Sequence, residues 1–146
     1  MEPYHELITP WQREFQNIIG NNNAKYFDER QLLYFRNEEF DLLYPAYGDT
    51  YPIYNGAIGM TYEKAGGGIG GLAVKTSATD TLTLKERLEH HFLTGLSTVE
   101  ATYHNSENVI LEFQNYFRTA NEGDAKKVKT FIISNENNQN KLQDFL

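Results

Sequence analysis

Hydrophobic residues recur at helical spacing in the first part of this chain. Thr9 and Pro10 form a good helix start, because Thr9 can cap, Pro10 suits the first helical position, and Gln12 completes a capping box. The residues that follow give one apolar face as far as about residue 29: Trp11, Phe15, Ile18, Ile19 and Tyr26. This pattern predicts a helix over residues 9–29.

Two more helical patterns lie in the second half of the chain. The clearest one begins with Thr83 and Glu86, which are spaced as a capping box, and continues to residue 103. Its apolar stripe consists of Leu84, Leu88, Phe92, Leu96, Val99 and Tyr103. Ser106 can cap a further helix, in which we expect four residues to face inward: Val109, Ile110, Phe113 and Phe117.

Short apolar stretches bounded by turn residues predict strands at residues 32–36, 57–64 and 72–75. Helices packed on such strands make an α/β fold, with part of a mixed sheet in an α/β/α layer. Residues 40–54 break both periodicities and contain four tyrosines: Tyr44, Tyr47, Tyr51 and Tyr54. A long aromatic loop is usually functional or packed over something, although any single tyrosine can equally fill the side of the core.

The character of the chain changes near residue 121. Residues 121–124 form a hydrophilic break, and residues 128–133 have the composition of a buried strand. A polar turn and the beginning of an apolar-faced helix follow. We therefore expect two units, with residues 1–121 in one domain and residues 122–146 as a linker and the start of a following α/β domain.

Composition excludes several classes of function. The formal net charge is −7 over 146 residues, and the longest basic cluster is Lys126, Lys127 and Lys129, which argues against nucleic acid or an anionic membrane as a partner. No apolar run approaches the ~20 residues of a membrane helix, and the polar start does not resemble a signal peptide. The absence of cysteine removes disulfides, thiol nucleophiles and cysteine-type zinc sites.

Two motifs that suggest ligands fail on their context. Residues 66–71 match G-x-G-x-x-G, but a strand-like sequence follows where a dinucleotide site needs a helix. His90 and His91 are adjacent on a predicted helix, so their side chains point about a hundred degrees apart and seldom share one metal. We expect no metal site formed by this chain alone.

Glu63 is the candidate catalytic residue. It lies near the end of the apolar stretch 57–64, just before the glycines of residues 66–71. A carboxylate there is costly to desolvate without a partner, and glycines allow another backbone or a ligand to approach closely. An active-site strand and an ordinary edge strand with a solvent-facing Glu63 both fit this pattern.

Two segments together resemble a known family. Leu43-Tyr44-Pro45-Ala46-Tyr47-Gly48, followed by Met60-Thr61-Tyr62-Glu63, is similar to the closing half of a zinc carboxypeptidase domain of the carboxypeptidase A type, in its large bacterial branch. The resemblance covers roughly residues 8–119. It implies that Tyr44, with Tyr47 in the same loop, binds the substrate's terminal carboxylate and that Glu63 is the catalytic glutamate.

The resemblance also implies an activity and a cofactor. Such enzymes hydrolyse C-terminal residues of peptides with a zinc ion, whose ligands in this case would precede the chain. The parent protein would then be a secreted or periplasmic peptidase, and this fragment alone would be inactive. Two other classes stay open: a peptide- or glycan-binding module that uses the aromatic loop, and a structural half-domain whose exposed sheet edge pairs with the missing part or with a second copy.

Overall fold

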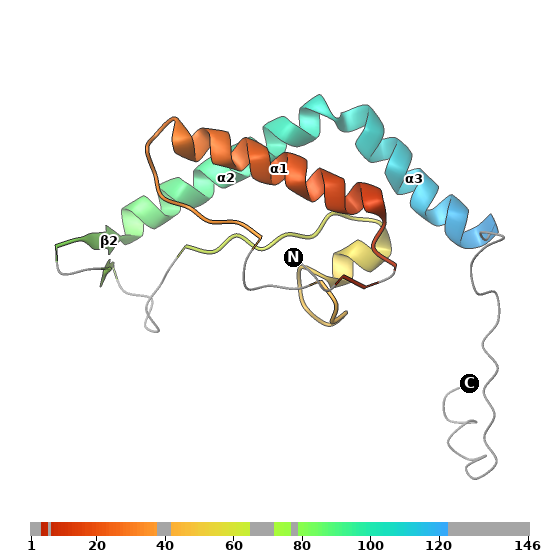
Figure 1. The fold of residues 1–146 in the computed structure, drawn as a ribbon, viewed down its shortest axis with the longest axis horizontal. Coiled ribbons are helices and arrows are strands. Elements are labelled where there is room, and N and C mark those ends of the chain that lie inside the picture. Colours follow the sequence, from red (N-terminus) through yellow and green to blue (C-terminus); the bar gives the residue numbers. More distant parts are fainter. Residues whose placement is uncertain (1–3, 6, 38–41, 65–71, 77–78, 123–146) are drawn as a thin grey trace, which may run out of the picture.

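Three long helices carry most of this fold. The computed structural model describes residues 4–5, 7–37, 42–64, 72–76 and 79–122. Within them the chain is mixed α/β, with a small two-stranded antiparallel sheet (Figure 1). The elements in chain order are α1 (Pro10–Asp28), the 3-10 helix η1 (Tyr51–Asn55), β1 (Ala73–Lys75), β2 (Thr81–Thr83), α2 (Leu84–His104) and α3 (Ser106–Glu122).

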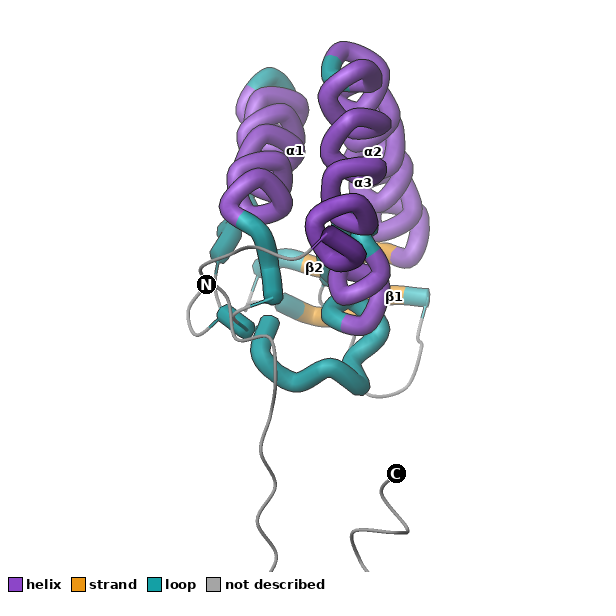
Figure 2. Tube along the Cα trace, turned by 90° about the vertical axis from the view of Figure 1, so that its right-hand side faces the viewer, coloured by secondary structure: helices purple, strands orange, loops and turns teal. Residues whose placement is uncertain are grey.

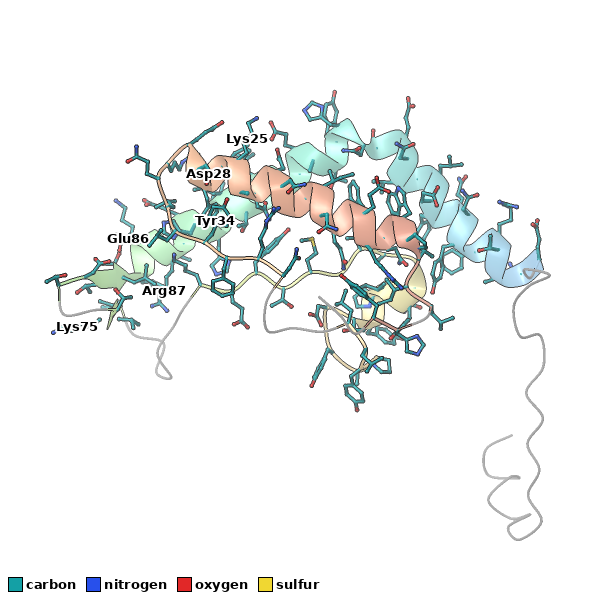
Figure 3. All side chains as sticks on the ribbon, viewed as in Figure 1. Lys25, Asp28, Tyr34, Lys75, Glu86 and Arg87 are labelled. Carbon is teal, nitrogen blue, oxygen red and sulfur yellow. The ribbon has the colours of Figure 1, made fainter. Side chains whose placement is uncertain are left out.

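The helix starts follow the local sequence closely. The hydroxyl of Thr9 accepts from the backbone N–H of Gln12 at 3.2 Å, and the Gln12 side chain accepts from the Thr9 N–H at 2.9 Å. Thr83 and Glu86 form the same reciprocal pair at the start of α2, at 3.2 and 2.7 Å. The Thr83 hydroxyl, and less strongly the Thr83 N–H, donate to the Glu86 carboxylate and hold the pKa of that carboxyl below its ordinary value. Figure 3 shows Glu86 at the end of α2 that adjoins the sheet. Both predicted capping boxes are confirmed.

The strand prediction at residues 72–75 is confirmed as β1. It pairs antiparallel with β2, with Ala73 opposite Thr83 and Lys75 opposite Thr81. Residues 81–83, which directly precede the helix predicted from Thr83, form the second strand of the hairpin. The reason is local, since β-branched threonines flank Leu82 and favour extended backbone until Thr83 turns the chain into α2.

The strands predicted at residues 32–36 and 57–64 are wrong. Both stretches are irregular, with no ladder to any described residue. After α1 the chain reverses through Gln31, which has a φ of 56°, and the Leu32 N–H donates to the Phe27 carbonyl at 3.0 Å. Leu33 is then 92% exposed. An apolar stretch becomes a strand only where another strand takes up its backbone groups.

Two buried clusters stabilise the fold. The larger one joins α1 to α2 through Phe15, Ile19 and Ala101, with partly buried residues packed around it, among them Ile58 from the segment 57–64. The smaller one joins Ile8 to Leu42 and Ile53 of the aromatic loop. Figure 2 shows α1 standing alongside α2 and α3.

The apolar stripe of α2 is exposed. Phe92 is 68% exposed, and every other member of that stripe is also exposed in the part of the chain that the structure describes. The buried residues of α2 are Leu93, Ser97 and Ala101, on a different face. The prediction that α3 turns four apolar residues inward is also wrong, because α3 has no buried residue and only Val109 of the four is half-buried. The helical pattern is correct, but no described element covers the stripe of α2, and the apolar face of α3 is covered only in part, where Val109 packs on the larger cluster.

Parts of the predicted organisation lie outside the described residues. These are the glycine stretch 66–71, the predicted strand at residues 128–133 and almost all of the expected second unit, residues 122–146.

Candidate functional site

The aromatic loop folds into a compact unit rather than an open connection. Ile53 and Thr50 at its centre are fully buried. The Thr50 N–H donates to the Tyr47 carbonyl at 3.2 Å, and the Tyr54 hydroxyl donates to the Leu43 carbonyl at 3.1 Å. From α3, the hydroxyl of Tyr116 donates to the Tyr54 carbonyl at 2.7 Å and holds the loop against the helix. The loop is therefore a fixed platform.

The tyrosines of this loop divide into two roles. Tyr54 is half-buried, and burial, with a smaller effect of the neighbouring Tyr116, raises the pKa of its hydroxyl. Tyr44 and Tyr47 are each 56% exposed, and their rings meet edge to face with centroids 5.2 Å apart. Tyr51 is also exposed. Tyr54 thus fills the core from the side, while the two tyrosines that the sequence assigned to substrate form one aromatic surface.

The segment 57–64 is attached to α1 by glutamine side chains instead of by a strand. The amide of Gln12, a buried residue, donates to the carbonyls of Ile53 and Ala57, both at 2.9 Å. One turn later the amide of Gln16 donates to the Gly59 carbonyl at 2.7 Å. These bonds satisfy backbone acceptors that a sheet would otherwise satisfy. They explain how an irregular chain is held at a defined place against α1.

A close contact joins the loop to this segment. The Thr61 hydroxyl donates to the Asp49 carboxylate at 2.7 Å. Gly59 lies so close to Asp49 that a Cβ at this position would overlap the Asp49 carbonyl oxygen, so only glycine fits. Sequence reasoning missed Asp49 and Gln16 and gave Gln12 only its capping role. The one available signal was a glycine inside an apolar stretch, which marks a close backbone approach without naming the partner.

Glu63 lies near the far end of this attached segment. Its side chain is exposed, next to Tyr62, whose hydroxyl lies 2.7 Å from that of Thr98 on α2. Figure 1 shows the segment running from η1 along α1, away from the loop that carries Tyr44 and Tyr47. Extended chain advances at most ~3.3 Å per residue, so the six steps from residue 57 to residue 63 can span up to roughly 20 Å. The structure brings the two tyrosines together and places Glu63 apart from them.

The described residues hold no ready metal site. No group of three or more His, Asp or Glu side chains converges among them, so the zinc that the resemblance implies finds no ligand set there. His90 is half-buried and its ring lies 5.7 Å from that of Phe27, and burial is the main cause that lowers its pKa. No helix in the described part of the chain is long and apolar enough to cross a membrane.

Comparisons with known proteins give no relative. No family, no curated protein and no solved structure matches this chain.

Proposed function

We propose that this chain is the second half of a catalytic domain of the zinc carboxypeptidase type, which removes C-terminal residues from peptides. The observation that supports this most is the junction between Asp49 and Thr61. It joins the loop that presents Tyr44 and Tyr47 to the segment that carries Glu63, and the exposed Glu63 side chain lies two residues beyond this junction, apart from the tyrosines. The loop and the segment that carry the resemblance are thus joined by a hydrogen bond.

The exposed faces of α2 and α3 support the idea of a partial domain. Covering the apolar stripe of α2 would stabilise the protein by about 25 cal/mol for each Å² of apolar surface removed from water. Large apolar patches that stay exposed mark a surface that contacts something else. In the proposed arrangement the sheet of the complete α/β/α layer covers this stripe, and residues 122–146 lead into the next domain.

The proposed chemistry assigns one task to each residue. Glu63 takes a proton from the water that attacks the scissile carbonyl and then gives it to the leaving amine. Tyr44 donates a hydrogen bond to the terminal carboxylate of the substrate, and the edge-to-face contact with Tyr47 fixes the direction of its ring. A zinc ion held by residues outside the described part would polarise the carbonyl.

The test uses the complete parent protein and two conservative variants. Glu63→Gln keeps size and removes the base, so turnover of a blocked dipeptide should fall by ~10²–10⁴ while folding and zinc content persist. Tyr44→Phe removes one hydrogen bond and should cost only about tenfold. If Glu63→Gln keeps hydrolysis within a few-fold of the parent, Glu63 is not the base and the proposal fails.

A metal titration of the 146-residue chain separates this proposal from a metal site on α2. Calorimetry with zinc in slight excess should show no submicromolar site, because the ligands are expected elsewhere. A submicromolar site that His90→Ala or His91→Ala removes would show that the helix itself binds the metal.

The exposed tyrosine pair favours a second candidate, a peptide- or glycan-binding module without catalysis. Aromatic faces are good platforms for such ligands, and two adjacent exposed rings supply one here. Binding of an oligosaccharide or peptide to this chain in the presence of a chelator, lost in Tyr44→Ala and Tyr47→Ala, would support this candidate. Loss of binding on chelation would exclude it.

A further inference from the structure

A pocket separate from the tyrosine loop and from Glu63 lies between α1, the segment 57–62, α2 and α3. Its volume is about 660 Å³, which is within the range of small-molecule sites. Among the described residues, no charged side chain lines it. Its walls are mostly apolar and include Phe15, Ile19, Ile58, Met60, Val109 and Phe113.

The polar atoms on the α2 side of this pocket can accept hydrogen bonds but have no proton to offer. The Thr98 hydroxyl donates its one proton to the Thr94 carbonyl at 2.7 Å. In the 2.7 Å contact between Tyr62 and Thr98, Tyr62 must therefore be the donor. The Thr102 hydroxyl donates to the Thr98 carbonyl, also at 2.7 Å. Free lone pairs remain on the oxygens of Tyr62 and Thr102.

These features restrict the chemistry of a ligand. A carboxylate or an ammonium group would lose part of its hydration against this wall and find no counter-charge among the lining residues. The side-chain donors among the lining residues are the Trp11 indole and the Gln114 amide, which belong to α1 and α3. Gln114 is exposed, so water competes for its amide. The α2 wall is complementary to a hydroxyl group that donates.

We propose that this pocket binds a neutral, largely apolar molecule with one hydroxyl group, such as a medium-chain primary alcohol. The hydroxyl donates to the oxygen of Tyr62 or Thr102, and the hydrocarbon chain lies against Phe15 and Ile58. At ~30 Å³ for each water-sized group, a chain of about ten such groups fills roughly half of the pocket. The site shares no residue with the proposed catalytic function, so either proposal can fail without the other.

The single tryptophan of the chain provides the measurement, because Trp11 lines the pocket. Its emission should change saturably when 1-octanol is added. Methyl octyl ether, which lacks the donor, and octanoate at pH 8 should each bind about tenfold more weakly or worse. Equal affinity for all three ligands, tighter binding of octanoate, or no saturable change would each overturn the proposal.

Two variants locate the polar contact. Tyr62→Phe and Thr102→Val each remove an acceptor, and together they should abolish the preference for octanol over the ether. Tyr103→Phe is the matched control, since Tyr103 lies on the same helix as Thr102, is exposed and does not line the pocket. If Tyr62→Phe fails to fold, two other variants test the site. The nearly isosteric Thr102→Val should reduce the preference for octanol, and Val109→Phe should narrow the pocket and weaken the binding of both octanol and the ether. Unchanged binding in those two variants would place the ligand elsewhere.

Discussion

Helices α1 and α2 begin with the same capping pattern, but their apolar stripes lie in opposite environments. Each starts with a threonine that forms a complete capping box, and each carries a regular apolar stripe. In α1 the stripe is covered, and Phe15 is 2% exposed. In α2 it faces outward, and Phe92 is exposed. Periodicity thus indicates which face gains from burial, but it does not tell whether a partner for that face is present.

The contact between the two helices explains the choice of face. α2 turns Ser97 and Ala101 toward α1, and such small residues let two helices approach closely. The Asn22 amide on α1 donates to the Ser97 hydroxyl at 3.0 Å and to the Glu100 carboxylate at 2.8 Å. Hydrogen bonding from Asn22 is the main cause that lowers the pKa of Glu100. A face with small residues and one buried hydroxyl therefore contacts α1, and the face with the larger apolar side chains is left exposed.

The largest expected effect is the difference in stability between alanine variants of two phenylalanines. Phe15→Ala should lower the free energy of unfolding by about 3–5 kcal/mol, since it leaves a cavity in the larger core cluster. Phe92→Ala should change it by no more than about 0.5 kcal/mol, because its side chain is exposed. Urea denaturation of the two variants measures both values. Similar losses would show that something covers the α2 stripe in solution.

Overpacking the α1–α2 contact should have the next largest effect. Ser97 is fully buried, so Ser97→Leu should destabilise the chain by about 1–3 kcal/mol and remove one acceptor of Asn22. Val99→Leu, two residues along on the exposed stripe, is the control and should be nearly neutral. Thermal and urea unfolding give the comparison, and a neutral Ser97→Leu would contradict the close helix contact.

Gly95→Ala should act in the opposite direction. A Cβ added to Gly95 meets nothing within 4 Å, so the change should stabilise α2 by about 0.5–1 kcal/mol through helix propensity alone. Chemical denaturation at two protein concentrations is the measurement. Destabilisation that grows with concentration would mean that a second molecule occupies this face.

The smallest expected effect is a dependence on pH at His90. Its pKa is lowered chiefly by burial, so the neutral form is favoured in the folded state. Its contribution is complete above the unfolded pKa of ~6.5 and is lost as the pH falls through the lower folded pKa. His90→Asn should therefore flatten the slope of unfolding free energy below pH 6.5. A slope that stays the same in this variant would contradict the assignment.

The sequence by itself determined the features that depend on residues close together along the chain. Thr9 with Gln12, and Thr83 with Glu86, are three residues apart, so the partners of both capping boxes are written in the local sequence. The tyrosine pair of the candidate site is equally local, because Tyr44 and Tyr47 are also three residues apart. Strand β1 was predicted from its own apolar residues, and the partner that completes it, β2, lies only a few positions further along the chain.

Only the tertiary structure decided the features that join distant segments. The Gln12 amide bonds to carbonyls 41 and 45 residues away, and the Asp49–Thr61 junction depends on how the loop folds back on the segment 57–64. Whether residues 57–64 formed a strand depended on whether another strand or a glutamine side chain took their carbonyls. The apolar pattern is the same in both cases, because it records the preference of the side chains and not the partner of the backbone.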